Sequence, residues 1–244
     1  IDKNSPTLTI TNKARKPDGT PDWTKEVTIT ASDANLYKIT VDKEDISNGT
    51  TYKTTGQHTV TATDKAGNEV TEAFWIDASG PDITTTPGVT DRTWAGSSVT
   101  VRAEDAHSGL NTFTVTKEGG QPKAGSNGTY PINETGKYTV TAKDKLGNTS
   151  TREIWIDVTP TAITTTNYNG DWTNKDVTVS ASDGQQSGLD TFTVTKEGEQ
   201  LYSGTASYPL NATGIYTVTA TDKVGKTRTT TVKIDKDDPT SSWA

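Results

Sequence analysis

The sequence predicts an all-β fold: three tandem β-sandwiches of about seven strands each, joined as an elongated rod. Three observations lead to this expectation. Near-copies of one phrase, HTVTATDKAGN, YTVTAKDKLGN and YTVTATDKVGK, begin at residues 58, 138 and 216. Threonine alternates with apolar residues along these phrases, and Gly and Pro separate the apolar runs. No segment shows the capped periodicity of a useful amphipathic helix.

The Ile-Asp dipeptides that begin at residues 1, 76, 156 and 234 mark the period of the repeat. A period of about 80 residues is too long for a solenoid repeat and suits a small domain with its own core. We therefore expect Ig-sized domains at 1–76, 77–156 and 157–234. Residues 235–244 are expected to begin a fourth repeat or to form a linker.

Strands follow from the alternation of apolar and polar residues. In YTVTA, the side chains of Tyr138, Val140 and Ala142 fall on one face, and the threonines fall on the other. The same pattern occurs in VTITA, VTVRA and VTVSA, which begin at residues 27, 99 and 177. In the second unit we expect strands near 82–86, 97–104, 110–117, 121–124, 129–132, 137–143 and 149–156.

The repeated phrase also contains a turn and a corner. DKAG, DKLG and DKVG place Asp first and Gly last, which predicts a type I turn followed by a Gly with positive φ. Tyr138 and Tyr216 lie two residues before Val140 and Val218, as in the tyrosine corner of immunoglobulin-like sandwiches, with Val in place of Cys. His58 takes the corner position in the first unit, where we expect a structural role.

Composition excludes several classes of function. The net charge is −7 and 31 acidic residues exceed 24 basic ones, so no nucleic-acid partner is expected. No apolar stretch approaches the length of a membrane span, so no membrane insertion is expected. The chain has no Cys and two His, which excludes disulfides and Cys- or His-based metal sites. The absence of Met predicts an excised segment of a longer protein, so the lack of a signal peptide or wall anchor in this segment says nothing about the parent.

The succession of ID-x-x-x-P, W-x-x-x-x-V-T-V, G-x-Y-T-V-T-A-x-D-x-x-G-N and W-I-D resembles tandem bacterial Ig-like repeats. Such repeats occur in secreted or cell-wall-anchored surface proteins, chiefly of Gram-positive bacteria, and the resemblance covers essentially the whole chain. It implies an extracellular, non-catalytic stalk or spacer that projects a functional domain away from the cell. The alternative is an adhesin module that binds host or matrix glycans or proteins. The expected partners are the neighbouring domains of the same chain, and we expect a monomer.

Two constellations could carry covalent chemistry. His107 lies beside Glu104, Asp105 and Ser108, but the third copy has no His at the equivalent place, so we expect no catalytic residues and no bound cofactor. A Lys–Asn crosslink, as in some surface sandwiches, would need both residues buried on neighbouring strands. In DKAGN and DKLGN the Lys and Asn share one turn, and Lys226 replaces the Asn in the third unit.

Three sets of aspartates are expected to gather at one pole of each sandwich. The junction sets are Asp77, Asp105 and Asp144, and then Asp157, Asp183 and Asp222; the first unit has Asp2, Asp33 and Asp64. We expect these carboxylates to cap turns and to pair with nearby lysines. The alternative is Ca²⁺ bound at the domain junctions by hard oxygen ligands, stiffening the junctions without being needed for folding.

Tryptophans recur at fixed places. Trp23, Trp94 and Trp172 precede the second strand of each unit, while Trp75 and Trp155 end the last strand, where the third unit has Lys233. The recurrence of the first three favours packing in the core or at the junctions. Stacking against sugar rings is the alternative.

Overall fold

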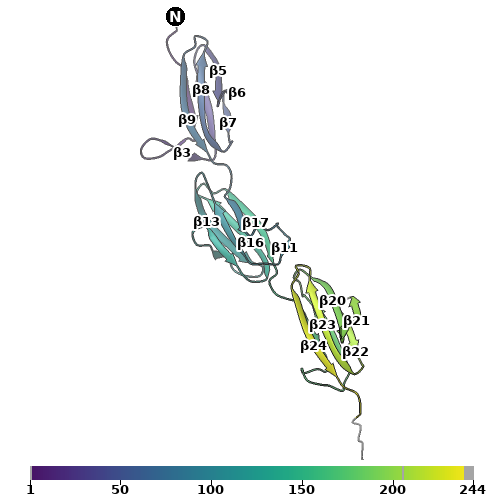
Figure 1. The fold of residues 1–244 in the computed structure, drawn as a ribbon. Coiled ribbons are helices and arrows are strands. Elements are labelled where there is room, and N and C mark those ends of the chain that lie inside the picture. Colours follow the sequence, from purple (N-terminus) through teal and green to yellow (C-terminus); the bar gives the residue numbers. More distant parts are fainter. Residues whose placement is uncertain (1, 205, 239–244) are drawn as a thin grey trace, which may run out of the picture.

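The computed structural model describes residues 2–204 and 206–238, and this part of the chain contains strands, turns and loops but no helix. Three immunoglobulin-like β-sandwiches follow one another end to end (Figure 1). Each has its own core of buried apolar side chains. Of the predicted fourth unit, residues 239–244 lie outside the described residues, and 235–238 form no strand.

The middle sandwich consists of two sheets. The strands of the smaller sheet are β10 (Asp82–Thr86), β12 (Val99–Glu104) and β15 (Thr129–Ile132). The strands of the larger sheet are β11 (Trp94–Ala95), β13 (Leu110–Lys117), β14 (Lys123–Ala124), β16 (Gly136–Asp144) and β17 (Thr149–Ile156). Their orders, β10-β12-β15 and β11-β17-β16-β13-β14, place β16 in the centre of the larger sheet.

The outer sandwiches repeat this plan. The first comprises β1 (Thr7–Thr11), β2 (Ala14–Arg15), β3 (Pro21–Thr24), β4 (Val27–Ser32), β5 (Leu36–Val41), β6 (Glu44–Ile46), β7 (Thr50–Tyr52), β8 (Gly56–Asp64) and β9 (Glu69–Ile76). The third comprises β18 (Ala162–Thr165), β19 (Val177–Ser182), β20 (Leu189–Lys196), β21 (Glu199–Gly204), β22 (Ser207–Leu210), β23 (Gly214–Asp222) and β24 (Thr227–Ile234). Their sheets have the orders β1-β4-β7 and β2-β3-β9-β8-β5-β6, then β18-β19-β22 and β21-β20-β23-β24.

The predicted faces of the strands are confirmed. In β12, Val99, Val101 and Ala103 are buried and the residues between them are exposed. In β16, Val140 is fully buried while Thr139 points to solvent. Because side chains alternate across a strand, the apolar positions of both sheets meet in one core between them.

The short strand β11 was not predicted. Trp94 and Ala95 pair in parallel with Trp155 and Ile156 at the edge of the larger sheet, and β3 pairs with β9 in the same way. A two-residue strand has no periodicity of its own. Its pairing depends on a partner about 60 residues later in the chain, which a local pattern cannot reveal.

The predicted turn and corner are confirmed. Gly147 has φ of 88° and its amide donates to the Asp144 carbonyl oxygen at 3.2 Å, closing the turn. The hydroxyl of Tyr138 donates to the carbonyl oxygen of Glu134 at 2.9 Å. Burial, with the nearby Glu134 charge, raises the pKa of Tyr138 to about 12. His58 replaces this tyrosine: it is buried, and its Nε2 donates to the Thr54 carbonyl oxygen at 2.8 Å.

Replacing Val140 by Ala is expected to lower the free energy of unfolding of the middle sandwich by about 1–3 kcal/mol, because it leaves a cavity in a closed core. Thr139→Ala, one residue away on the exposed face, is expected to change this free energy by less than about 0.5 kcal/mol. Hydrogen exchange of the amides of β16 measures both effects. Equal losses in the two variants would show that the assigned facing is wrong.

Candidate functional site

Three clusters of carboxylates lie along the rod, one at the start of each sandwich. In each, an oxygen from each of three aspartates lies within 4.8 Å of the others. One aspartate comes from the segment entering the sandwich, one follows the second long strand, and one ends the penultimate strand. The clusters are Asp2, Asp33 and Asp64; Asp77, Asp105 and Asp144; and Asp157, Asp183 and Asp222. The structure therefore brings together all nine aspartates that the sequence grouped.

An asparagine binds two members of the cluster at the first junction. Asp144 is fully buried, and its Oδ1 and Oδ2 accept hydrogen bonds from the backbone and side-chain amides of Asn148, both at 2.7 Å. The same side-chain amide donates to the backbone oxygen of Asp77 at 2.9 Å. The side chain of Asp77 accepts from the amide of Ser108 at 3.0 Å. The Asn148 side-chain amide thus connects the buried Asp144 carboxylate to the linker backbone at Asp77.

In the cluster of the first sandwich, an asparagine again donates two hydrogen bonds to the buried aspartate. Asn68 donates to Asp64 from its backbone and side-chain amides, both at 2.8 Å. Burial acts to raise the pKa of Asp64, but the hydrogen bonds from Asn68, together with those from the amides of Ala66 and Gly67, outweigh it and lower the pKa below its usual value. The Asp64 carboxylate is therefore stabilised in its ionised form.

The cluster at the second junction is the most buried of the three. Asp157, Asp183 and Asp222 are 0%, 6% and 1% exposed. Ser187 donates to Asp157 Oδ2 from its amide at 3.1 Å and its hydroxyl at 2.5 Å. The amide of Gly188 donates to Asp183 Oδ2 at 2.7 Å.

Lys226 stands in the second-junction cluster where the others have asparagine. Its backbone amide still donates to Asp222 Oδ1 at 2.7 Å, but a lysine has no side-chain amide to offer Oδ2. Asp222 Oδ2 is consequently buried without a hydrogen-bond donor in the described part of the chain, and Asp183 Oδ1, whose counterpart at the first junction receives no hydrogen bond from the asparagine either, is buried without one as well. Burial raises the pKa of Asp183, and the charges of Asp157 and Asp222 add to the rise.

Of the two roles expected for these aspartates, turn capping and pairing with lysines, the structure confirms only the first. They cap turns as predicted: Asp64, Asp144 and Asp222 each accept from the backbone amide four residues later. The predicted pairing with lysines is wrong for the described residues, where no ion pair involves any of the nine aspartates. Lys143 and Lys145 are exposed, because strand alternation and the turn direct their side chains away from buried Asp144.

His107 has a packing contact at the first junction. Its ring lies edge-on to that of Trp23 in the preceding sandwich, with centroids 4.8 Å apart. Its amide donates to Asp105 Oδ1 at 3.1 Å. The loop that carries His107 and Ser108 therefore contacts the preceding sandwich and its linker, since Ser108 binds Asp77.

Tryptophans pair within the first two sandwiches. Trp23 lies 5.3 Å from Trp75, and Trp94 lies 5.7 Å from Trp155, between ring centroids. The expectation of core or junction packing is wrong for Trp172, which is 54% exposed. The third sandwich has Lys233 where the others have the second tryptophan, so Trp172 lacks that aromatic partner.

The turns that contain Lys and Asn do not place them for a crosslink. Lys65 and Lys145 are exposed, whereas the side-chain amides of Asn68 and Asn148 are hydrogen-bonded to buried aspartates. Crosslinking would require the amine and the amide to meet in a desolvated site. Asn68 instead binds Asp64 at the start of the first sandwich, and Asn148 binds Asp144 at the first junction.

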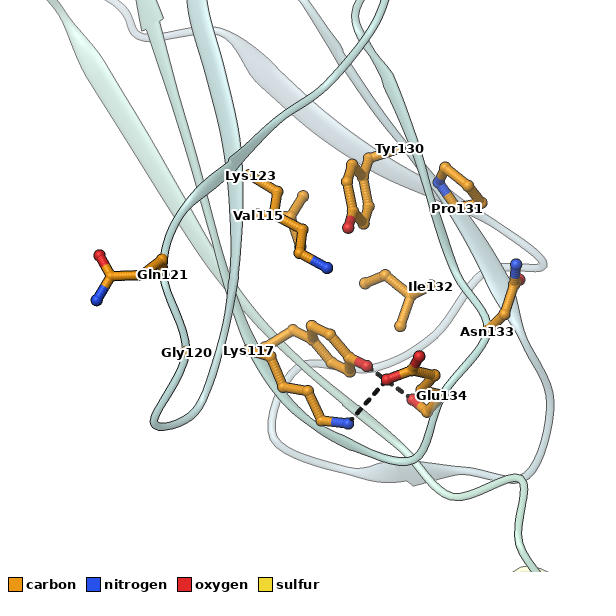
Figure 2. A pocket seen from close by; sticks show the side chains of 11 residues that line it. Val115, Lys117, Gly120, Gln121, Lys123, Tyr130, Pro131, Ile132, Asn133 and Glu134 are labelled. Carbon is orange, nitrogen blue, oxygen red and sulfur yellow. Dashed lines mark hydrogen bonds and ion pairs between the residues drawn. The ribbon is translucent and has the colours of Figure 1, made fainter.

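A hollow of about 270 Å³ opens at one side of the middle sandwich, between β13 and β15 (Figure 2). Within it, Lys117 Nζ lies 3.2 Å from Glu134 Oε2 (Figure 2). Lys117 Nζ also lies 5.9 Å from the ring centroid of Tyr138, the corner residue. The third sandwich has a similar hollow of about 240 Å³, lined by Lys196 and Tyr208 among others. Its recurrence beside the tyrosine corner indicates that the hollow is the open edge between two sheets.

No family model and no curated protein matches the chain. Solved structures of tandem domains resemble it. A chain from the complex of Dpr2 Ig1-Ig2 with DIP-Theta Ig1-Ig3 is 14% identical, with 95% of this chain and 99% of that one covered and a TM-score of 0.34. Titin domains I67-I69 are 15% identical, with 86% of this chain and 90% of that one covered and a TM-score of 0.37. Fibronectin(III)-like modules of Clostridium thermocellum CbhA are 17% identical, with 63% of this chain and 93% of that one covered and a TM-score of 0.25. Because these TM-scores are below 0.5, the fold assignment rests on the strand pairing of this chain.

Proposed function

We propose that this chain is a non-catalytic spacer segment that holds its sandwiches in line and projects another domain of the same protein. The observation that carries the proposal is a buried aspartate in each linker that binds both neighbouring sandwiches. The amide of Asp77 donates to the Thr24 carbonyl oxygen at 2.8 Å in the first sandwich. Its side chain and its carbonyl oxygen accept from Ser108 and Asn148 in the second.

The second linker repeats this arrangement. The amide of Asp157 donates to the Ala95 carbonyl oxygen at 2.9 Å, and its side chain accepts from Ser187 in the third sandwich. One residue later, the amide of Val158 donates to the hydroxyl of Thr135 at 2.9 Å. A linker bonded on both sides has little freedom to bend, which is the property that a spacer requires.

The location of the spacer is part of the proposal. The repeat pattern supports an extracellular segment of a bacterial surface protein, secreted or attached to the cell wall of a Gram-positive bacterium. A chain without cysteine, which needs no disulfide, is compatible with this location. The described residues contain no helix that is long and apolar enough to cross a membrane.

Small-angle X-ray scattering tests the spacer geometry. Strands of six to nine residues at about 3.4 Å per residue, with their loops, give each sandwich a length of about 30–40 Å, so the rod should reach about 100 Å. Asp77→Ala combined with Asp157→Ala removes both linker side chains and should broaden the distribution of lengths. A compact, globular radius for the unmodified chain would rule out the spacer.

The alternative is an adhesin module, favoured by the exposed Trp172, whose indole could stack on a sugar ring. Binding of the fragment to panels of glycans and matrix proteins separates the two functions. The spacer predicts no saturable binder. Saturable binding that is lost in Trp172→Ala would favour the adhesin.

A further inference from the structure

We propose that the second junction binds one divalent cation of the calcium class between Asp157, Asp183 and Asp222, and that the other two clusters use an asparagine amide instead. This inference rests on the hydrogen bonds of the junctions and does not depend on the spacer function.

Two orphaned oxygens point to the ligand. Asp183 Oδ1 and Asp222 Oδ2 are buried without a donor in the described residues, and their side chains belong to a cluster whose oxygens lie within 4.8 Å of one another. A buried carboxylate oxygen without a partner is costly, so such a group normally has a donor, a proton or a metal. At the first junction the corresponding oxygen, Asp144 Oδ2, has the Asn148 amide at 2.7 Å.

The lysine that replaces asparagine does not supply the missing partner. No ion pair joins Lys226 to Asp222 among the described residues. Lys226 binds Asp222 through its backbone amide, which donates to Oδ1. The three carboxyl groups therefore share a buried space with no counter-charge bound to them among the described residues. A cation placed among the three would supply that charge and coordinate both orphaned oxygens.

The donor set favours calcium. All three side chains offer hard oxygen ligands, and the site contains no His or Cys, which softer metals prefer. Asp183 Oδ1 and Asp222 Oδ2 accept no hydrogen bond from the described residues, and Ca²⁺ accepts such carboxylate ligands in a flexible arrangement. Mg²⁺ usually keeps several of its waters, and the burial of all three aspartates leaves little room for them. Because Asp157 lies in the linker, the ion would tie the linker to the third sandwich.

Isothermal titration of the whole 244-residue chain with calcium chloride tests the proposal. We expect one ion per chain, with a Kd no weaker than the range of about 10⁻⁴–10⁻³ M of extracellular calcium modules. Asp222→Asn should abolish binding. The asparagine keeps Oδ1 as the acceptor for the backbone amides of Val224 and Lys226, so melting in chelator should show a folded protein. Asp144→Asn is the matched control at the first junction and should leave the stoichiometry at one.

Two substitutions of Lys226 distinguish the effect of a side-chain amide on calcium affinity from the effect of losing the lysine charge. Lys226→Asn should restore the amide of the other clusters and lower calcium affinity at least tenfold. Loss of the lysine charge alone would raise the affinity, and Lys226→Ala shows that effect without an amide. We expect the calcium affinity to fall in Lys226→Asn and not to fall in Lys226→Ala.

Three results would overturn the proposal. The first is no binding heat and no shift in melting temperature at about 10 mM calcium, well above the expected Kd. The second is binding that survives Asp222→Asn or a stoichiometry of three, which would remove the distinction between the clusters. The third is stabilisation on acidification with no response to calcium, which would show that the carboxylates share a proton.

Discussion

Phe192→Ala is expected to lower the free energy of unfolding of the third sandwich by about 3–5 kcal/mol. The ring of Phe192 is fully buried in the core, and its centroid lies 6.1 Å from that of Tyr202. Its removal opens a cavity that a sandwich of two hydrogen-bonded sheets closes only in part. Single domains are often stable by only about 5–15 kcal/mol, so a loss of this size should bring the third sandwich close to unfolding at room temperature.

Hydrogen exchange by domain is the suitable measurement, because three sandwiches do not share one unfolding transition. Protection should fall in β20 and β23 and stay unchanged in β8 and β16. The matched control is Thr191→Ala, which alters an exposed neighbour on the same strand and should have little effect. A loss in Phe192→Ala that spread to the first two sandwiches would contradict independent cores.

Gly125→Ala is expected to destabilise the middle sandwich by about 3 kcal/mol through overpacking. A Cβ at this position would lie 2.1 Å from Cδ1 and 2.3 Å from Cε1 of Phe113, and 2.9 Å from the carbonyl oxygen of Thr129. Phe113 is itself buried in the core, so its ring has little space into which to move. The glycine is needed for this close approach and not for an unusual φ.

Gly88→Ala is the matched control within the same sandwich. A Cβ there meets no atom within 4 Å, and its φ is not positive. Alanine should therefore be neutral or stabilise by up to about 1 kcal/mol, since it restricts the unfolded chain. Denaturant unfolding of the two variants should give changes of opposite sign or clearly different size. Equal destabilisation would show that the contact with Phe113 is not the cause.

The two junctions share the hydrogen bonds of their linker aspartates but differ at one residue of the repeated phrase. Asp77 and Asp157 bind both neighbouring sandwiches through equivalent hydrogen bonds. At the first junction the Asn148 side chain donates to Asp144 Oδ2, whereas at the second Lys226 has no side-chain amide to donate to Asp222 Oδ2. A single substitution in the repeated phrase thus changes the chemistry of a junction without changing the fold. Similar sandwiches along one rod can therefore differ in their response to cations.

Much of this architecture could be predicted from local pattern. The facing of β12 and β16 follows from alternation over a few residues, because a strand places successive side chains on opposite faces. The turn after Asp144 follows from Asp and Gly at set positions. The grouping of Asp77, Asp105 and Asp144 followed from counting strand ends, since strands that finish at the same pole bring their last residues together.

Only the tertiary structure decided which groups have partners. The two-residue strand β11 and the exposure of Trp172 each depend on atoms many residues away in the chain. The donor missing from Asp222 Oδ2 is a local effect of Lys226, but the burial of that oxygen depends on the packing of the linker against the third sandwich. Alternation is a property of one strand and is visible in its sequence. A hydrogen bond is satisfied only within a few tenths of an ångström of its ideal length, and that distance is set by how two sheets and a linker pack. The repeat therefore determined the sandwiches, and their packing determined the chemistry of the junctions.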